Sequence, residues 1–249
     1  MTNSSIIILL SLLAVMVTIT TVISYFYTTM RNTNHLFHLL SFCVLGWLIN
    51  DILFFASNDT DLILYFNTTK FLFVAFTPVF LLIFVFRFYR MNKYLTPSIL
   101  SVLIVVPTIT SALALIPSLQ FLLRSHAAVM QISPVTLVSN TQGFWFWINA
   151  AYSYLLLIIC ACVLLSKYQS LPKGHHLPSM IMMVAIVVAL VTNWISLMPA
   201  FFLPFDLTVV GMSISLIFIY AASASSVTSE FLILAREEIF NYLEESLFI

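Results

Sequence analysis

The sequence predicts an all-α protein in which seven transmembrane helices form one bundle. Of the 249 residues, 62% are hydrophobic and only 7% are charged, and the mean hydropathy is +1.10. Soluble domains carry about 25% charged residues, so this chain has too few charges to cover a water-exposed surface. Seven apolar stretches reach the length of about 20 residues that a helix needs to cross a bilayer. Each must be helical, because an open sheet edge in lipid would leave backbone groups unpaired.

The predicted spans follow one another closely. They cover residues 5–29, 34–57, 62–89, 96–116, 143–166, 178–199 and 206–228. The first is a retained span rather than a signal peptide, because no basic residues precede it and no small-residue cleavage site follows it. Pro78 and Pro107 lie inside spans and predict kinks. The segment from Pro117 to Gln142 interrupts the apolar pattern, and we expect it to fold over the end of the bundle or to be mobile.

The basic residues predict the orientation of the bundle. One side carries seven of them, and the other side carries only Arg124. The seven are Arg31, Arg87, Arg90, Lys93, Lys167, Lys173 and Arg236. Since Lys and Arg collect in cytoplasmic loops, we expect the N-terminus outside and the C-terminus in the cytoplasm. The chain is therefore expected in the cell membrane with lipid around it, and its formal net charge of zero argues against a nucleic-acid partner.

Two ionisable side chains lie at membrane depth, where each costs about 2.5–3.5 kcal/mol on insertion scales. Asp51 and Lys70 fall at similar depth in the hairpin of the second and third spans, so we predict that they form an ion pair. The pair either fixes the register of the hairpin, or one partner binds a charged ligand group or relays a proton. Replacing either residue alone should harm folding or signalling, and exchanging the two should partly restore it.

Further polar and aromatic side chains fall at the same outer depth on four helices. Each has a structural alternative: tryptophans suit the interfacial belt, asparagines suit bonds between helices, and Asp206 suits the N-terminal cap of the seventh span. Their gathering at one depth favours a cavity open to the outside. The candidate ligand-binding residues are Asp51, Lys70, Asn50, Trp145, Asn149, Tyr152, Asn193 and Asp206.

We predict no metal site, no cofactor and no catalytic residues. The three cysteines show neither metal-ligand nor disulfide spacing, and the histidines near the inner end are loosely spaced with no carboxylate beside them. The sequence contains no Gly-x-Ser-x-Gly and no His-Glu-x-x-His motif, which disfavours an intramembrane enzyme. Lys70 is the only lysine within a span and lies on the third, which disfavours a retinal protein.

The composition changes after the seventh span, which divides the chain into a sensor domain, residues 1–229, and a cytoplasmic linker, residues 230–249. The linker carries charged residues around an apolar stripe with helical spacing. We expect a signalling helix marked by Arg236, Ile239, Leu243 and Leu247. Such a helix needs a partner for its stripe, most simply the same helix of a second subunit. We therefore expect a homodimer in which this rod carries a shift across the membrane.

Four segments resemble one protein family. They are FTPVFLLIFVFRFYR (76–90), GFWFWINAAYSYLLLI (143–158), FDLTVVGMSISLIFIYAA (205–222) and LAREEIFNYLEESLFI (234–249). In this order they resemble the N-terminal seven-transmembrane sensor region of bacterial histidine kinases and some diguanylate cyclases. The resemblance implies signal sensing ahead of a PAS, kinase or cyclase domain, and implies no catalytic residues. None of these output domains occurs in the 249 residues, so we expect an excised sensor part or a stand-alone copy.

The first functional hypothesis is a receptor module that detects a small-molecule or peptide signal and acts on a cytoplasmic kinase or cyclase output domain. The alternative is a small-molecule transporter or channel. The odd number of spans without internal repeats speaks against the transporters that are built from inverted repeats. Sensing therefore remains the favoured hypothesis, with the transporter kept open.

Overall fold

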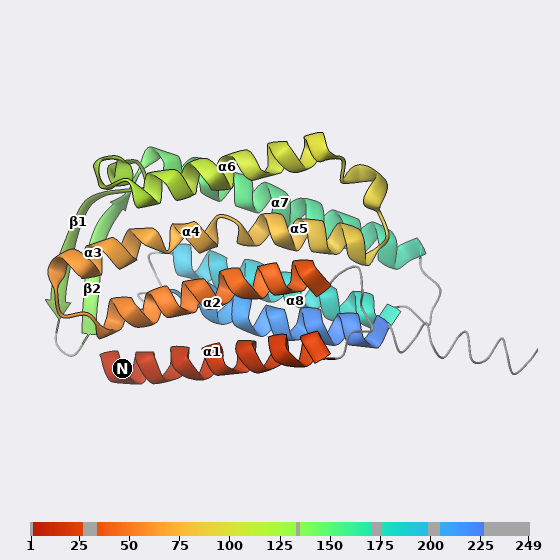
Figure 1. The fold of residues 1–249 in the computed structure, drawn as a ribbon, viewed down its shortest axis with the longest axis horizontal. Coiled ribbons are helices and arrows are strands. Elements are labelled where there is room, and N and C mark those ends of the chain that lie inside the picture. The colour runs from red at the N-terminus through yellow and green to blue at the C-terminus, as the bar shows by residue number, and fades with distance from the viewer. Residues whose placement is uncertain (1, 27–33, 133–134, 171–175, 199–204, 227–249) are drawn as a thin grey trace, which may run out of the picture.

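A computed structural model describes residues 2–26, 34–132, 135–170, 176–198 and 205–226. Within these ranges seven helices are long and apolar enough to cross a membrane, which confirms the predicted all-α bundle. Six of the spans contain the labelled helices of Figure 1, and the seventh, the last blue helix, has no label. The unbroken helices are α1 (Asn3–Phe26), α2 (Asn34–Ala56), α6 (Pro97–Leu115), α7 (Phe144–Ser170), α8 (His176–Leu197) and the seventh span (Leu207–Ser226).

The four residues of the expected signalling helix lie outside the described residues. These are Arg236, Ile239, Leu243 and Leu247. The linker over residues 230–249 therefore stays a prediction.

The third span is broken into three helical pieces. They are α3 (Thr60–Thr69), α4 (Phe71–Val74) and α5 (Thr77–Phe88). Pro78 lies in the first turn of α5, where a residue without an N–H is tolerated because that N–H would have no partner. The kink expected at Pro78 is therefore confirmed, whereas α6 continues through Pro107 to Leu115. The first break falls at Lys70, between α3 and α4.

The segment before α7 forms a β-hairpin that the sequence analysis did not predict. After the short helix η2 (Pro117–Leu122), strand β1 (Arg124–Ile132) pairs antiparallel with β2 (Val135–Gln142). Arg124 stands opposite Gln142 at the base of this hairpin. The strands pair their backbone groups with each other, as a segment beyond the hydrocarbon must do if it is neither helical nor solvated. Figure 1 shows the hairpin at the end of the bundle where α1 begins and α2 ends.

The N-terminal helix is tied to this hairpin by one side chain. The Asn3 Nδ2 donates to Thr136 Oγ1 at 2.9 Å, and the Thr136 backbone N–H donates to Asn3 Oδ1 at 3.0 Å. The same Nδ2 lies 3.4 Å from the carbonyl oxygen of Phe55 at the end of α2. Asn3 therefore joins α1, α2 and the hairpin.

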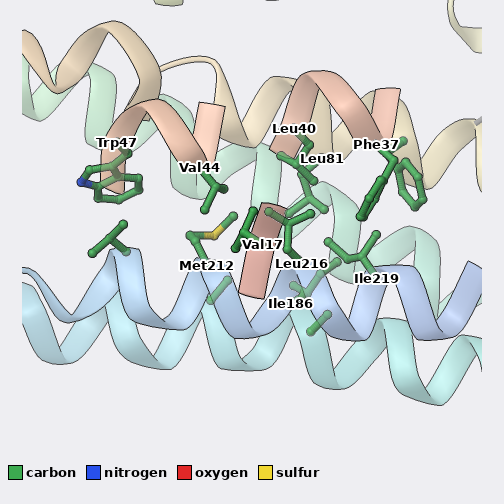
Figure 2. Packing of buried hydrophobic residues seen from close by; sticks show 14 of the residues in the cluster. Val17, Phe37, Leu40, Val44, Trp47, Leu81, Ile186, Met212, Leu216 and Ile219 are labelled. Atoms are coloured by element: carbon green, nitrogen blue, oxygen red, sulfur yellow. The ribbon is translucent and has the colours of Figure 1, made fainter. Parts of the chain in front are cut away.

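The main core lies between α1, α2, α5, α7, α8 and the seventh span. Figure 2 shows one face of α2 directed toward the seventh span, and the side chains recur at helical spacing on both. The labelled contacts across this interface come from Phe37, Leu40 and Val44 on α2 and from Met212, Leu216 and Ile219 on the seventh span. Large apolar side chains on the outer faces of the helices stay exposed in the bundle. Lipid tails suit these faces.

Candidate functional site

A cavity of about 490 Å³ lies within the hairpin end of the bundle. Its walls come from α2, the broken third span, the hairpin, α7, α8 and the seventh span, because each contributes lining residues. The polar lining residues are Asp51, Asn67, Lys70, Thr77, Arg124, Thr136, Gln142, Asn149, Ser153, Tyr154, Asn193, Ser196, Asp206 and Thr208. Aromatic and aliphatic side chains fill the rest of the wall. A cavity of this size, with apolar walls and convergent polar groups, is typical of small-molecule sites.

Lys70 lies between two carboxylates in this cavity. Its Nζ is 3.1 Å from Asp206 Oδ2 and 3.8 Å from Asp51 Oδ1. The pair with Asp51 is the one that the sequence predicted, and it is confirmed. The shorter contact is with Asp206, at the start of the seventh span. Lys70 and Asp51 are buried, so each needs the opposite charge beside it.

Asp206 has two partners at the start of the seventh span. Its Oδ1 accepts a hydrogen bond from the Thr208 backbone N–H at 3.1 Å, which confirms the predicted helix cap. Its Oδ2 accepts from Lys70. Asp206 therefore meets an opposite charge from Lys70 and a backbone donor from Thr208 at the same time. One ionised carboxylate therefore links the seventh span to the break in the third.

Arg124 supplies a second cation from the base of the hairpin. Its Nη1 donates to Asn67 Oδ1 on α3, and its guanidinium carbon lies 5.4 Å from the ring centre of Phe71. Desolvation lowers the pKa of Arg124 to about 10, against the opposing attraction of Asp206 and Asp51. The guanidinium is therefore charged at neutral pH. The sequence shows Arg124 as the one basic residue on the predicted outer side. A single cation in that position could have marked Arg124 as a candidate site residue.

Hydrogen bonds between helices surround the cavity. The Tyr154 hydroxyl on α7 donates to Asn193 Oδ1 on α8, and Asn193 Nδ2 donates to Thr208 Oγ1 on the seventh span at 3.4 Å. The Thr110 hydroxyl on α6 lies 3.2 Å from Asn149 Oδ1 on α7, to which it donates. These bonds fix the mutual rotation of four helices. They account for both asparagines as structural residues that also line the cavity.

The predicted ligand-binding residues divide into two groups. Asp51, Lys70, Asn149, Asn193 and Asp206 all line the cavity. The other three are absent from the lining, and each bonds a neighbouring helix instead. Asn50 Nδ2 donates to Thr69 Oγ1, Trp145 Nε1 to Thr110 Oγ1, and the Tyr152 hydroxyl to the Leu103 carbonyl oxygen, at 3.0, 2.9 and 2.7 Å. These three hydrogen bonds join neighbouring helices, which gives the three residues a structural role.

Several lining groups have no hydrogen-bond partner among the described residues. These groups include the buried atoms Asn67 Nδ2, Arg124 Nε, Gln142 Oε1 and Ser196 Oγ. Buried polar groups in native proteins are nearly always paired with protein or with ordered water. The cavity therefore offers unmet donors and acceptors to whatever enters it. None of these four side chains was among the sequence candidates.

The fold and the site define a multi-pass membrane protein with a cavity inside a seven-helix bundle. Residues 10–226 match the family described as the N-terminal 7TM region of histidine kinase. The chain belongs to this family, which confirms the resemblance noted in the sequence. The matched region is a sensor region rather than a catalytic domain. A comparison with curated proteins found no match.

Proposed function

We propose that this bundle receives an extracellular or membrane signal in the cavity and passes it through the seventh span to a cytoplasmic kinase or cyclase output domain or partner. The observation that supports it best is the bond between Lys70 and Asp206, because it joins the cavity to the first turn of the seventh span. A change at Lys70 therefore acts directly on the helix that leads toward the cytoplasm.

The proposed mechanism is a shift between two packings of the seventh span. A ligand shifts such an equilibrium only by the difference in its affinity for the two states. A ligand that contacts Lys70 or Asp206 has that difference, because it competes with the 3.1 Å bond between them. When the bond weakens, the Asp206 cap keeps its bond to Thr208, so the helix start stays intact while its tie to the third span is lost.

The remaining parts of the proposal concern the two ends of the signal path. The signal enters from the outer side of the cell membrane, and the linker after the seventh span carries it onward. In a homodimer the stripe of Ile239, Leu243 and Leu247 pairs with its copy. A relative shift of the two seventh spans then changes the pairing of the linkers.

The experiment measures whether the cavity controls the far end of the seventh span. Spin labels are placed at Asn92→Cys and Ser226→Cys after the three native cysteines are replaced, and the distance distribution is recorded by pulsed electron paramagnetic resonance in lipid nanodiscs. Lys70→Met and Asp206→Asn are each expected to change the distribution. Ser153→Ala is the matched control, because Ser153 lines the same cavity but bonds only a carbonyl of its own helix.

Two results would count against sensing. An unchanged distribution in both Lys70→Met and Asp206→Asn would show that the ion cluster does not control the seventh span. Solute flux through liposomes that contain the purified protein would favour the transporter alternative instead. Movement of the seventh span without flux would support the sensory proposal.

A further inference from the structure

The unmet polar groups of the cavity gather near the base of the hairpin. Asn67 is 6% exposed and lines the cavity, and its Nδ2 is buried without a partner among the described residues. Its Oδ1 already accepts from Arg124, which fixes the direction of the amide. Arg124 Nε is likewise buried and unpaired. Asn67 and Arg124, which are hydrogen-bonded to each other, therefore each carry an unused N–H donor.

Of the two cations that line the cavity among the described residues, Arg124 has no close carboxylate. Of the described residues that line the cavity, Lys70 forms the ion pairs within 4.0 Å, and its partners are Asp51 and Asp206. Asp51 and Asp206 act on Arg124 only at longer range. A guanidinium presents its donors as a rigid fork that matches the two oxygens of a carboxylate. The one hydrogen bond to Asn67 leaves most of that fork open.

The walls beside Arg124 are apolar. Phe71 lies under the guanidinium, and its ring centre is 6.0 Å from that of Phe146 in an edge-to-face contact. Both rings are buried and both line the cavity. Val74 and Leu157 extend the same lining. A ligand bound here would therefore meet paired donors at one end and hydrocarbon along its body.

We propose that the cavity binds a small organic carboxylate with an apolar body, whose two oxygens accept hydrogen bonds from Arg124 and Asn67. This inference rests on the sensory function proposed above and names the chemical class of its signal. Asp51 is held by Lys70 only at 3.8 Å, so an ammonium group on the same ligand also has a carboxylate to meet. A plain carboxylate and an amino acid share the recognised group, and the test separates them.

The test uses three probes of one shape: 3-phenylpropanoate, its uncharged amide 3-phenylpropanamide, and phenylalanine. Binding to the whole chain in nanodiscs is measured by isothermal titration calorimetry. We expect 3-phenylpropanoate, phenylalanine or both to bind, and the amide to bind at least tenfold more weakly. Tighter binding of phenylalanine than of 3-phenylpropanoate would assign an amino acid, and the reverse would assign a plain carboxylate. The proposal is overturned if neither carboxylate binds at concentrations up to about 10 mM, because a specific site binds more tightly than that.

Variants connect the binding to the named groups. Arg124→Gln is expected to lower the affinity for the carboxylate at least tenfold and to leave the affinity for the amide unchanged. Lys93→Gln is the matched control, since it removes an exposed cation that contacts Tyr94 far from the cavity lining. Arg124→Lys keeps the charge but loses the fork, and we expect intermediate affinity, which also shows that the position tolerates change. Equal affinity of Arg124→Gln and the parent protein for the carboxylate overturns the proposal.

The two proposals fail in different ways. If the carboxylate binds through Arg124 but does not change the distance between labels at positions 92 and 226, the ligand class stands and the sensory function fails. If neither carboxylate binds while Lys70→Met moves the seventh span, the ligand class fails and the sensory function stands.

Discussion

Lys70 illustrates how one residue decides the arrangement of the cavity. Charged groups at membrane depth are costly, and a buried ion pair stabilises little compared with an apolar substitute. Breaking such a pair, in contrast, leaves an uncompensated charge. Lys70 lies near two carboxylates, at 3.1 and 3.8 Å, so its removal leaves both of them without their cation.

We expect Lys70→Met to lower the free energy of unfolding by about 3 kcal/mol, the lower end of the range for breaking a buried pair. The lower end applies because the Asp206 side chain is 24% exposed and water screens part of its charge. The measurement is thermal unfolding in detergent. The control combines Lys70→Met with Asp51→Asn and Asp206→Asn, which removes every charge of the cluster and should recover most of the loss. A single variant as stable as the parent protein would contradict this account.

Asp206, the third member of the ion cluster, affects the variant in which Asp51 and Lys70 are exchanged, for which the sequence predicted partial recovery. Asp51→Lys combined with Lys70→Asp restores a pair between positions 51 and 70, but it also puts a carboxylate at position 70 opposite Asp206. Sequence reasoning found the Asp51–Lys70 pair because the two residues share one hairpin. It did not find the Lys70–Asp206 bond, which joins residues 136 positions apart. Depth along a helix can be read from a sequence, whereas the choice of neighbour among seven helices depends on the packing of the whole bundle.

Among the elements, the broken third span depends on a close approach to α2. A Cβ built on Gly46 would lie 2.3 Å from a ring carbon of Phe73 on α4, closer than atoms in contact can lie. Gly46 therefore lets α4 pack against α2, and α4 begins directly after Lys70. The position of the ion cluster follows from this contact.

Gly46→Ala is expected to destabilise the bundle by about 1–3 kcal/mol, the usual cost of overpacking a core. Phe73→Leu removes the ring atoms that the new methyl group meets, so Gly46→Ala with Phe73→Leu should recover part of the loss. Melting temperatures of the three variants in detergent provide the comparison. If Gly46→Ala alone melts like the parent protein, α4 has room to move away from α2 and the contact does not position Lys70.

The bond between Asn3 and the hairpin can be tested with a conservative pair of variants. Asn3→Ala removes the acceptor of the Thr136 N–H and the donor to the Thr136 hydroxyl. Asn3→Asp keeps an acceptor for the backbone N–H. We expect faster hydrogen exchange at Thr136 in Asn3→Ala by about fivefold, as one lost hydrogen bond of about 1 kcal/mol implies, and a smaller effect in Asn3→Asp. Unchanged exchange in both variants would mean that the hairpin holds its place without α1.

The helices and the hairpin differ in how well the sequence predicts them. Every span was predicted to within a few residues, because lipid imposes a length and a composition on each. The hairpin lies outside that constraint and carries a weaker signal. Two runs with strand-forming residues, up to Ile132 and from Val135, flank a Ser-Pro dipeptide, a pattern that reads as a hairpin. The expectation of a long loop gave too little weight to this pattern.

For the whole molecule, the orientation in the membrane remains a prediction from the basic residues. The structure puts Asn58 in the turn at the hairpin end of the bundle and Lys93 in the connection between α5 and α6, and both are exposed. In a background without native cysteines, Asn58→Cys should react with a membrane-impermeant maleimide on intact cells, and Lys93→Cys only after lysis. The reverse labelling pattern would show that the bundle has the opposite orientation, with the cavity on the cytoplasmic side.

Five of the eight candidate residues line the cavity, and the physical reason for the other three is helix rotation. Trp145 and Asn149 share one face of α7 and both bond Thr110 of α6, yet only Asn149 lines the cavity. Spacing along one helix identifies a face, but the neighbours of that face belong to the packed bundle. The place of Arg124 in the cavity was not predicted, because it follows from the hairpin, which was itself not predicted.

The hairpin brings its own hydrogen-bond partners, since each strand satisfies the other. Its cavity-lining side chains can be exchanged without altering the sequence of the spans, although Thr136 and Arg124 also bond α1 and α3. If the cavity binds the ligand proposed above, recognition and anchoring lie mostly in different segments, and a designer who wants the bundle to bind a different compound should begin with the cavity-lining positions of the two strands.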